Sequence, residues 1–105
     1  MKCIAMGKYA PNVVRGVLAD PQARVTAIRS LVEGVGGTWI DGFFVRGPFD
    51  FAFMCEMPNE EAVGAMHAVV YATGAVEGVS IHTEVDIDKV ATIAASATGA
   101  YTPPS

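Results

Sequence analysis

The chain has 105 residues, 51 % of them hydrophobic and only 17 % charged, which suffices for one domain whose core needs no metal or disulfide. Its net charge is −4 and its seven basic residues are scattered, so a nucleic-acid-binding surface is not expected. The apolar run at the start is too short for a signal peptide or a membrane span. We therefore expect a cytoplasmic, single-domain protein (residues 1–105) without a membrane partner, and its apolar excess predicts a homodimer or larger homo-oligomer.

The first part of the chain predicts a strand followed by helices. Residues 3–9 are strand-like, and Pro11 ends the strand because proline has no N–H to donate. A short apolar face at helical spacing follows at residues 13–18. A longer helix is predicted to start at the N-cap Asp20 and to end at the glycine pair of residues 36 and 37.

The second part predicts a hairpin, a helix, a strand and a last helix. Strands at 38–45 and 50–57 flank a four-residue loop, and the Pro-Asn-Glu-Glu run after them is typical of a helix start. That helix should end at Gly74. Residues 79–85 alternate apolar and polar side chains, which indicates a half-buried strand, and Asp86 or Asp88 caps a final helix.

This order predicts an α+β, ferredoxin-like βαββαβ fold with an antiparallel four-stranded sheet and an extra C-terminal helix. Its helices cover one face of the sheet, and water or another subunit must meet the other. We expect the first and third strands to run parallel. Cys3 and Cys55 would then lie at opposite ends of these strands as free thiols, and the cysteines and histidines have no metal-ligand spacing.

The hairpin register predicts which side chains share the open face of the sheet. If Val45 pairs with Asp50, the helix-covered side holds Thr38, Ile40, Gly42, Phe44, Phe51, Phe53, Cys55 and Met57. The open side then holds Trp39, Asp41, Phe43, Val45, Asp50, Ala52, Met54 and Glu56, joined by Ser80, His82 and Glu84 and, by elimination, by Ile4, Met6 and Lys8. An apolar floor with a few polar groups fits a subunit interface with paired charges and equally a small-ligand pocket.

The sequence at the hairpin, Val-Arg-Gly-Pro-Phe-Asp-Phe, raises the question of whether it holds a site. A carboxylate at such a loop commonly accepts hydrogen bonds from the turn, so Asp50 is expected to brace the loop. Lys8 and Tyr9 lie near the start of a helix, where they could hold an anion. With parallel first and third strands, Lys8 would meet Glu56 and His82 at the opposite end of the sheet and form the polar rim of a pocket.

Several landmarks together resemble the GYD-domain family of small bacterial and archaeal proteins, over nearly the whole chain. They are GKYAP at 7–11, the glycine pair at 36 and 37, GPFD at 47–50, PNEEA at 58–62, HTEV at 82–85 and YTPPS at 101–105. The family signature is a glycine, a variable residue, a tyrosine and an aspartate; Gly47, Pro48 and Asp50 fit it, whereas Phe49 replaces the tyrosine. The loss of a hydroxyl leaves only an aromatic packing role there. The resemblance implies a dimeric α+β barrel in which two sheets meet through their open faces, and it implies no established activity.

Two functional interpretations follow. The first is a homo-oligomeric protein that binds a small organic ligand on the open face through Lys8, Tyr9, Trp39, Asp41, Phe43, Asp50, Met54, Glu56, His82 and Glu84. The second is a cofactor-independent isomerase, cyclase or oxygenase for an apolar substrate, in which His82, Glu56 or Lys8 moves protons. Neither interpretation needs a cofactor or a metal. The other histidine, His67, is expected on the flank of a helix and is not assigned to the site.

Overall fold

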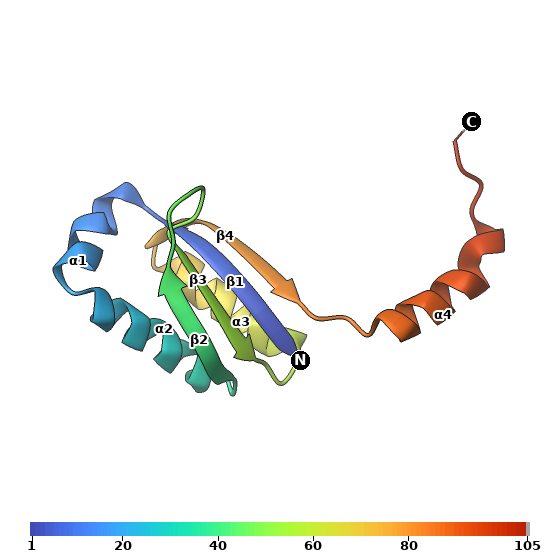
Figure 1. The fold of residues 1–105 in the computed structure, drawn as a ribbon, viewed down its shortest axis with the longest axis horizontal. Coiled ribbons are helices and arrows are strands. Elements are labelled where there is room, and N and C mark those ends of the chain that lie inside the picture. The colour runs from blue at the N-terminus through green and yellow to red at the C-terminus, as the bar shows by residue number, and fades with distance from the viewer. Residues whose placement is uncertain (105) are drawn as a thin grey trace.

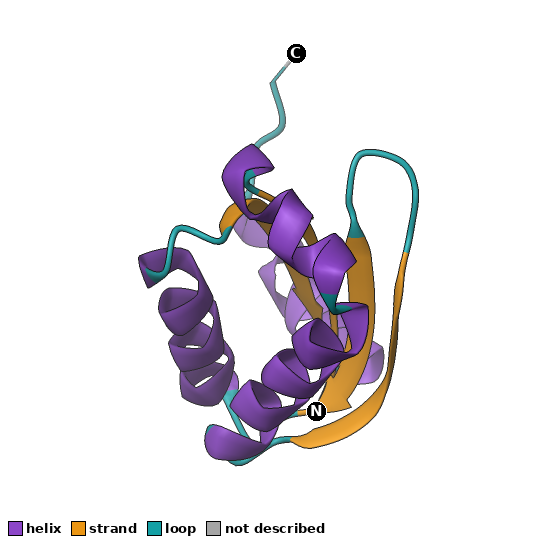
Figure 2. Ribbon diagram, turned by 90° about the vertical axis from the view of Figure 1, so that its left-hand side faces the viewer, coloured by secondary structure: helices purple, strands orange, loops and turns teal. Residues whose placement is uncertain are grey.

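The computed structural model describes residues 1–104, and Ser105, the last residue of the predicted tail, lies outside them. A four-stranded sheet carries helices on one face, and a last helix stands away from it (Figures 1 and 2). The elements are β1 (Lys2–Tyr9), the 3₁₀ turn η1 (Pro11–Val13), α1 (Val14–Ala19), α2 (Pro21–Gly34), β2 (Thr38–Phe44), β3 (Phe51–Glu56), α3 (Glu60–Ala72), β4 (Val76–Thr83), α4 (Ile87–Ala97) and the 3₁₀ turn η2 (Thr98–Ala100).

The helix boundaries follow from local capping chemistry. The Asp20 carboxylate accepts from Ala23 N at 3.2 Å, and the Asn59 side chain accepts from Ala62 N at 2.8 Å, so each satisfies a free N–H of its helix. After α2, Gly36 has a φ of 92°, and after α3, Gly74 has a φ of 71°, a left-handed conformation that favours glycine. The predicted starts and ends of both long helices are therefore confirmed.

The strand order is β2-β3-β1-β4, and every neighbouring pair is antiparallel. The ferredoxin-like α+β fold is thereby confirmed. The expectation that the first and third strands run parallel is wrong: α2 carries the chain back so that β2 runs parallel to β1, and the hairpin then reverses β3 between them. Cys3 consequently pairs directly with Cys55, both as free thiols, instead of lying at the other end of the sheet.

The core lies between the sheet and the helices. Cys3, Cys55 and Val32 are completely buried and Ala5 is 1 % exposed. Phe51 and Phe53 are also buried, with 7 % and 8 % of their surface exposed. Burial out of water raises the pKa of both thiols, and burial together with the neighbouring Cys3 raises the pKa of Cys55 to about 12. Buried and more exposed residues alternate along β1 and β3, so the residues of both strands lie on the faces of the sheet that the sequence predicted for them.

The predicted register of β2 is only half right because the strand contains a bulge. Trp39 pairs with Cys55 and Asp41 pairs with Met54, so Ile40 is an extra residue between them. The bulge turns Trp39 to the helix side, where its ring stacks on Phe53 with centroids 5.4 Å apart, and Thr38 to the open side, opposite Glu56. Any side chain at Gly42 would collide with the indole ring, which explains the glycine in this strand.

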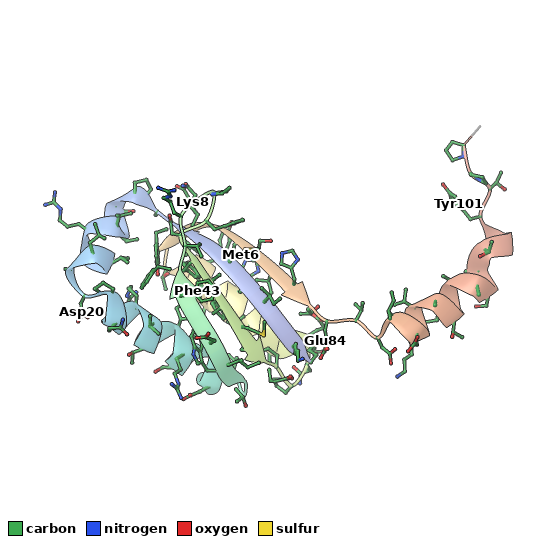
Figure 3. All side chains as sticks on the ribbon, viewed as in Figure 1. Met6, Lys8, Asp20, Phe43, Glu84 and Tyr101 are labelled. Carbon is green, nitrogen blue, oxygen red and sulfur yellow. The ribbon has the colours of Figure 1, made fainter. Side chains whose placement is uncertain are left out.

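After β4 the chain leaves the body of the domain. Every residue from 84 to 104 is exposed, and α4 extends beyond the end of the sheet, with Tyr101 near its far tip (Figures 1 and 3). The longest dimension is 57 Å and the radius of gyration 17.2 Å, against about 13 Å for a compact chain of this length. We call residues 84–104 the arm, and residues 1–83 the body.

Candidate functional site on the open sheet face

The pairing of the four strands arranges the open face in rows. The two middle rows, read from β2 to β4, are Phe43, Ala52, Met6 and Ser80, then Asp41, Met54, Ile4 and His82. Phe43 is 59 % exposed and Ile4 43 % exposed, and Ala52, Met54 and Met6 are half-buried. The face is thus an apolar centre between a carboxylate at the β2 edge and a polar pair at the β4 edge. Figure 3 labels Met6 and Phe43, which lie on different strands of this centre.

Ser80 and His82 form the polar pair at the β4 edge. They lie two residues apart on the same face of the strand, and the Ser80 hydroxyl and His82 Nε2 are 2.7 Å apart. His82 pairs with Ile4 in the neighbouring strand, so its ring borders the apolar centre. The pair can donate or accept a hydrogen bond at this edge. The prediction that His82 lies on the open face is confirmed.

A second polar group lies at the end of the sheet where β1 begins. Glu56 pairs with Lys2 across the strands, and its carboxylate is 3.3 Å from the N-terminal ammonium. The Glu84 carboxylate accepts from the backbone N–H of Lys2 at 2.7 Å. Both predicted carboxylates are therefore engaged with the first two residues. The groups that hold them, the N-terminal ammonium and the backbone N–H of Lys2, were missed because backbone groups give no signal in a sequence.

The predicted cluster of Lys8, Glu56 and His82 does not form. Lys8 is six residues along β1 from Lys2, the partner of Glu56, which separates them by about 20 Å at about 3.3 Å per residue. Lys8 pairs with Gly78, four residues before His82, and its Nζ lies 4.0 Å from Glu77. For Glu56 the reason is the antiparallel direction of β1 and β3, which brings Lys8 to the hairpin end of the sheet. For His82 the reason is that β4 begins at Val76 and not at residue 79 as predicted, so His82 lies near the end of the strand and not in its first half.

Asp50 has the predicted structural role at the hairpin, but its carboxylate is bonded to the end of β1 and not to the N–H groups of the turn, which the sequence predicted. Its carboxylate accepts from Tyr9 N at 2.9 Å, its own N–H donates to Gly7 O at 2.8 Å, and its carbonyl accepts from Val45 N at 2.9 Å. The last bond confirms the pairing of Val45 with Asp50. The aspartate of the GPFD sequence thus ties the hairpin loop to the end of β1 through its backbone and one carboxylate oxygen.

Tyr9 lies on the helix side of the sheet and not beside Lys8. It is 8 % exposed, and burial raises the pKa of its hydroxyl, an effect that the nearby Arg24 opposes. It borders a cleft of about 420 Å³ beside α1 and the start of α2 and another of about 190 Å³ between α2 and α3. The predicted anion site of Lys8 and Tyr9 is therefore divided between two faces.

His67 lies on the flank of α3, as predicted. Its ring meets Tyr71 edge-on at a centroid distance of 5.1 Å, and its Nε2 is buried without a hydrogen-bond partner among the described residues. The small space that it borders is otherwise lined by apolar side chains. Its neighbours therefore offer no second group for acid-base chemistry.

The sequence model of the GYD domain matches residues 3–94, which is most of the chain. No protein with a curated description matches it. Among residues 1–104, no helix is both long enough and apolar enough to cross a bilayer, and no three His, Cys, Asp or Glu residues are grouped as metal ligands would be.

Proposed function

We propose that this chain, which belongs to the GYD-domain family, pairs with a second copy through the open sheet face and holds a small, largely apolar molecule between the two sheets. The observation that carries the proposal is the apolar centre of that face. Ile4, Met6, Phe43, Ala52 and Met54 come from three strands and lie side by side in consecutive rows.

Such a face is unfavourable in water. Burial of apolar surface contributes about 25 cal/mol per Å², and an exposed apolar patch framed by polar residues is typical of an interaction site. In the middle of the sheet the helix-covered side is much less exposed, since Phe51 and Phe53 are 7 % and 8 % exposed whereas Phe43 is 59 % exposed; at the β2 edge of that side, Phe44 is 40 % exposed. A second sheet with the same pattern would cover the open face with matching chemistry.

The polar groups of the face suggest the class of ligand. The Asp41 carboxylate already accepts from Gly42 N at 2.8 Å, whereas Ser80 and His82 bond only to each other among the described residues. A ligand with an apolar skeleton and one hydrogen-bonding group would suit this arrangement. Lys8, Glu56 and His82 lie too far apart in one chain to act together in proton transfer. Their separation favours the binding function over the enzymatic alternative.

Sedimentation equilibrium at micromolar concentration tests the pairing. We expect a dimer for the native protein and at least a tenfold weaker dimer for Phe43→Glu, because two carboxylates would be buried at the interface. Leu18→Glu is the matched control, since Leu18 is 74 % exposed on α1, away from the sheet. A monomeric native protein, or equal effects of both substitutions, would contradict the proposal.

Binding of an apolar fluorescent anion, 1-anilinonaphthalene-8-sulfonate, tests the ligand site, together with native mass spectrometry for a co-purified molecule. His82→Ala should weaken binding of the dye with little change in melting temperature, because His82 is exposed in the body. Asp50→Asn should leave binding intact. Dye binding that is insensitive to both His82→Ala and Phe43→Glu would place the site elsewhere.

A further inference from the structure

The helix of the arm, α4, is amphipathic, and all of its residues are exposed in the described part of the chain, residues 1–104. In α4, Ile87, Val90, Ala94 and Ala97 recur at intervals of three and four and share one side, whereas Asp88, Lys89, Thr92 and Ser96 occupy the other. On the apolar side Ile87 and Val90 are 67 % and 45 % exposed, and Ile93, at the border of that side, is 68 % exposed. This side of the helix is called the α4 stripe below.

An isolated helix of this length is not stable in water. Helices shorter than about 12 residues are marginal by themselves, and most helical stability comes from packing an apolar face, whereas α4 has 11 residues. Its N-cap is well formed, since the Asp86 carboxylate accepts from Asp88 N at 3.1 Å and Lys89 N at 3.2 Å, but a cap adds only about 1 kcal/mol. The α4 stripe therefore needs a surface to pack on.

The path of the chain directs the arm away from its own body. Glu84 N donates to Lys2 O at 2.9 Å and its carboxylate accepts from Lys2 N at 2.7 Å, which continues β4 past the sheet. Only Val85 and Asp86 separate this anchor from α4. Figures 1 and 3 show the result: the arm projects beyond the end of the sheet and Glu84 lies at the junction.

We infer that the arm docks on a second copy of this chain, so that two copies exchange arms. The flat outline of the open face measures about 19 by 26 Å from its strand spacing and length, roughly 500 Å² in projection. A standard interface buries roughly 800 Å² of accessible surface per partner, so the sheet face alone gives a contact of small to standard size. A helix of 11 residues adds a strip about 16 Å long and brings the contact closer to that size. The family match runs to residue 94, so most of α4 belongs to the domain and is not an appended tail.

A membrane surface is the less suitable occupant. Helices that lie on membranes carry many lysines and arginines on the polar side, whereas α4 and its cap have one lysine and two aspartates. The inference shares the second copy with the proposed function, but it rests on a different contact, so the two can fail separately.

Amide hydrogen exchange of residues 90–97 tests the inference at two protein concentrations that bracket the dimer dissociation constant. Docking on a second copy predicts at least tenfold slower exchange at the high concentration, lost on dilution. Equal protection at both concentrations would mean that the arm folds back on its own body and would overturn the inference. No protection at either concentration, or protection only with anionic vesicles of phosphatidylserine and phosphatidylcholine, would also overturn it.

A pair of substitutions on the same helix separates the stripe from the rest of the arm. Val90→Asp should weaken the dimer at least tenfold in sedimentation, whereas Thr92→Asp, which adds the same charge on the polar side, should change it less than threefold. Both residues are exposed in the single chain, so neither variant should change folding of the body. A dimer lost in Phe43→Glu but kept in Val90→Asp would overturn the arm exchange alone, and the reverse pattern would overturn the sheet pairing alone.

Discussion

The two faces of this sheet are made from alternate residues of the same strands, yet they meet different surroundings. On β1, Cys3 and Ala5 are 0 % and 1 % exposed beneath the helices, whereas Ile4, between them in sequence, is 43 % exposed. The covered face is filled within one chain, and the open face is not. Apolar residues on the covered face should therefore determine the stability of the monomer, and those on the open face should determine its association.

The largest expected contrast is between two phenylalanines. Phe53→Ala removes a ring that stacks on Trp39 in the core and should lower the free energy of unfolding by about 3–5 kcal/mol. Phe43→Ala, on the open face, should lower it by less than about 1 kcal/mol at concentrations where the protein is monomeric. Urea unfolding of dilute protein measures both values. Equal losses would show that the open face is also part of the monomer's core.

Gly7→Ala should produce the next largest effect on the covered face. A β-carbon at this position would collide with the ring of Phe51, which is 7 % exposed and has little room to move. We expect a loss of about 1–3 kcal/mol, typical of an overpacked core. Gly16→Ala in α1 is a control, because a β-carbon there meets nothing. A melting temperature that is unchanged in Gly7→Ala would contradict this account of the packing.

The brace at the hairpin tests whether Asp50 serves the fold. Asp50→Ala leaves the N–H of Tyr9 without its acceptor and should lower the free energy of unfolding by about 1–2 kcal/mol. Asp50→Asn keeps an acceptor and should lower it by about half as much or less. Thermal unfolding of the two variants checks the order. If Asn were as harmful as Ala, the charge and not the hydrogen bond would be the important property.

Titration of the two thiols on the covered face should have the smallest effect on the free energy of unfolding at neutral pH. The pKa of Cys55 is raised to about 12, so the native state keeps this proton up to a higher pH than the unfolded chain does. Stability from this group is complete below about pH 8.5, the ordinary pKa of a thiol, and falls as the pH rises through the native value. At pH 8, an aromatic disulfide reagent should label neither thiol in the native protein and both in urea. Fast labelling of the native protein would show that the covered face opens.

The elements of the fold were predictable because their signals are local. Asp20 and Asn59 as caps and Gly36 and Gly74 as ends each act within a few residues of the helix they bound. The bulge at Ile40 depends on a contact between Trp39 and the strand surface at Gly42, which alternation alone does not reveal. The direction of β1 relative to β3 depends on how α2 returns the chain, a property of the topology and not of either strand.

The candidate site was predictable as a face but not as a cluster. Asp41, Phe43, Met54 and His82 lie where alternation placed them, since side-chain direction has a period of two. The position of Lys8 along the sheet required the relative direction of two strands that are distant in sequence. Because that direction was predicted wrongly, the expected position of Lys8 relative to Glu56 was wrong by nearly the full length of the sheet.

The bulge in β2 also determines what an optical experiment can report. Trp39 is the single tryptophan, and the bulge places its indole ring on Phe53, under the helices, instead of on the open face. Its fluorescence is therefore a reporter of folding and should stay nearly constant when two copies separate on dilution. Emission and sedimentation consequently provide independent readings of one sample, the first of the monomer's integrity and the second of its association.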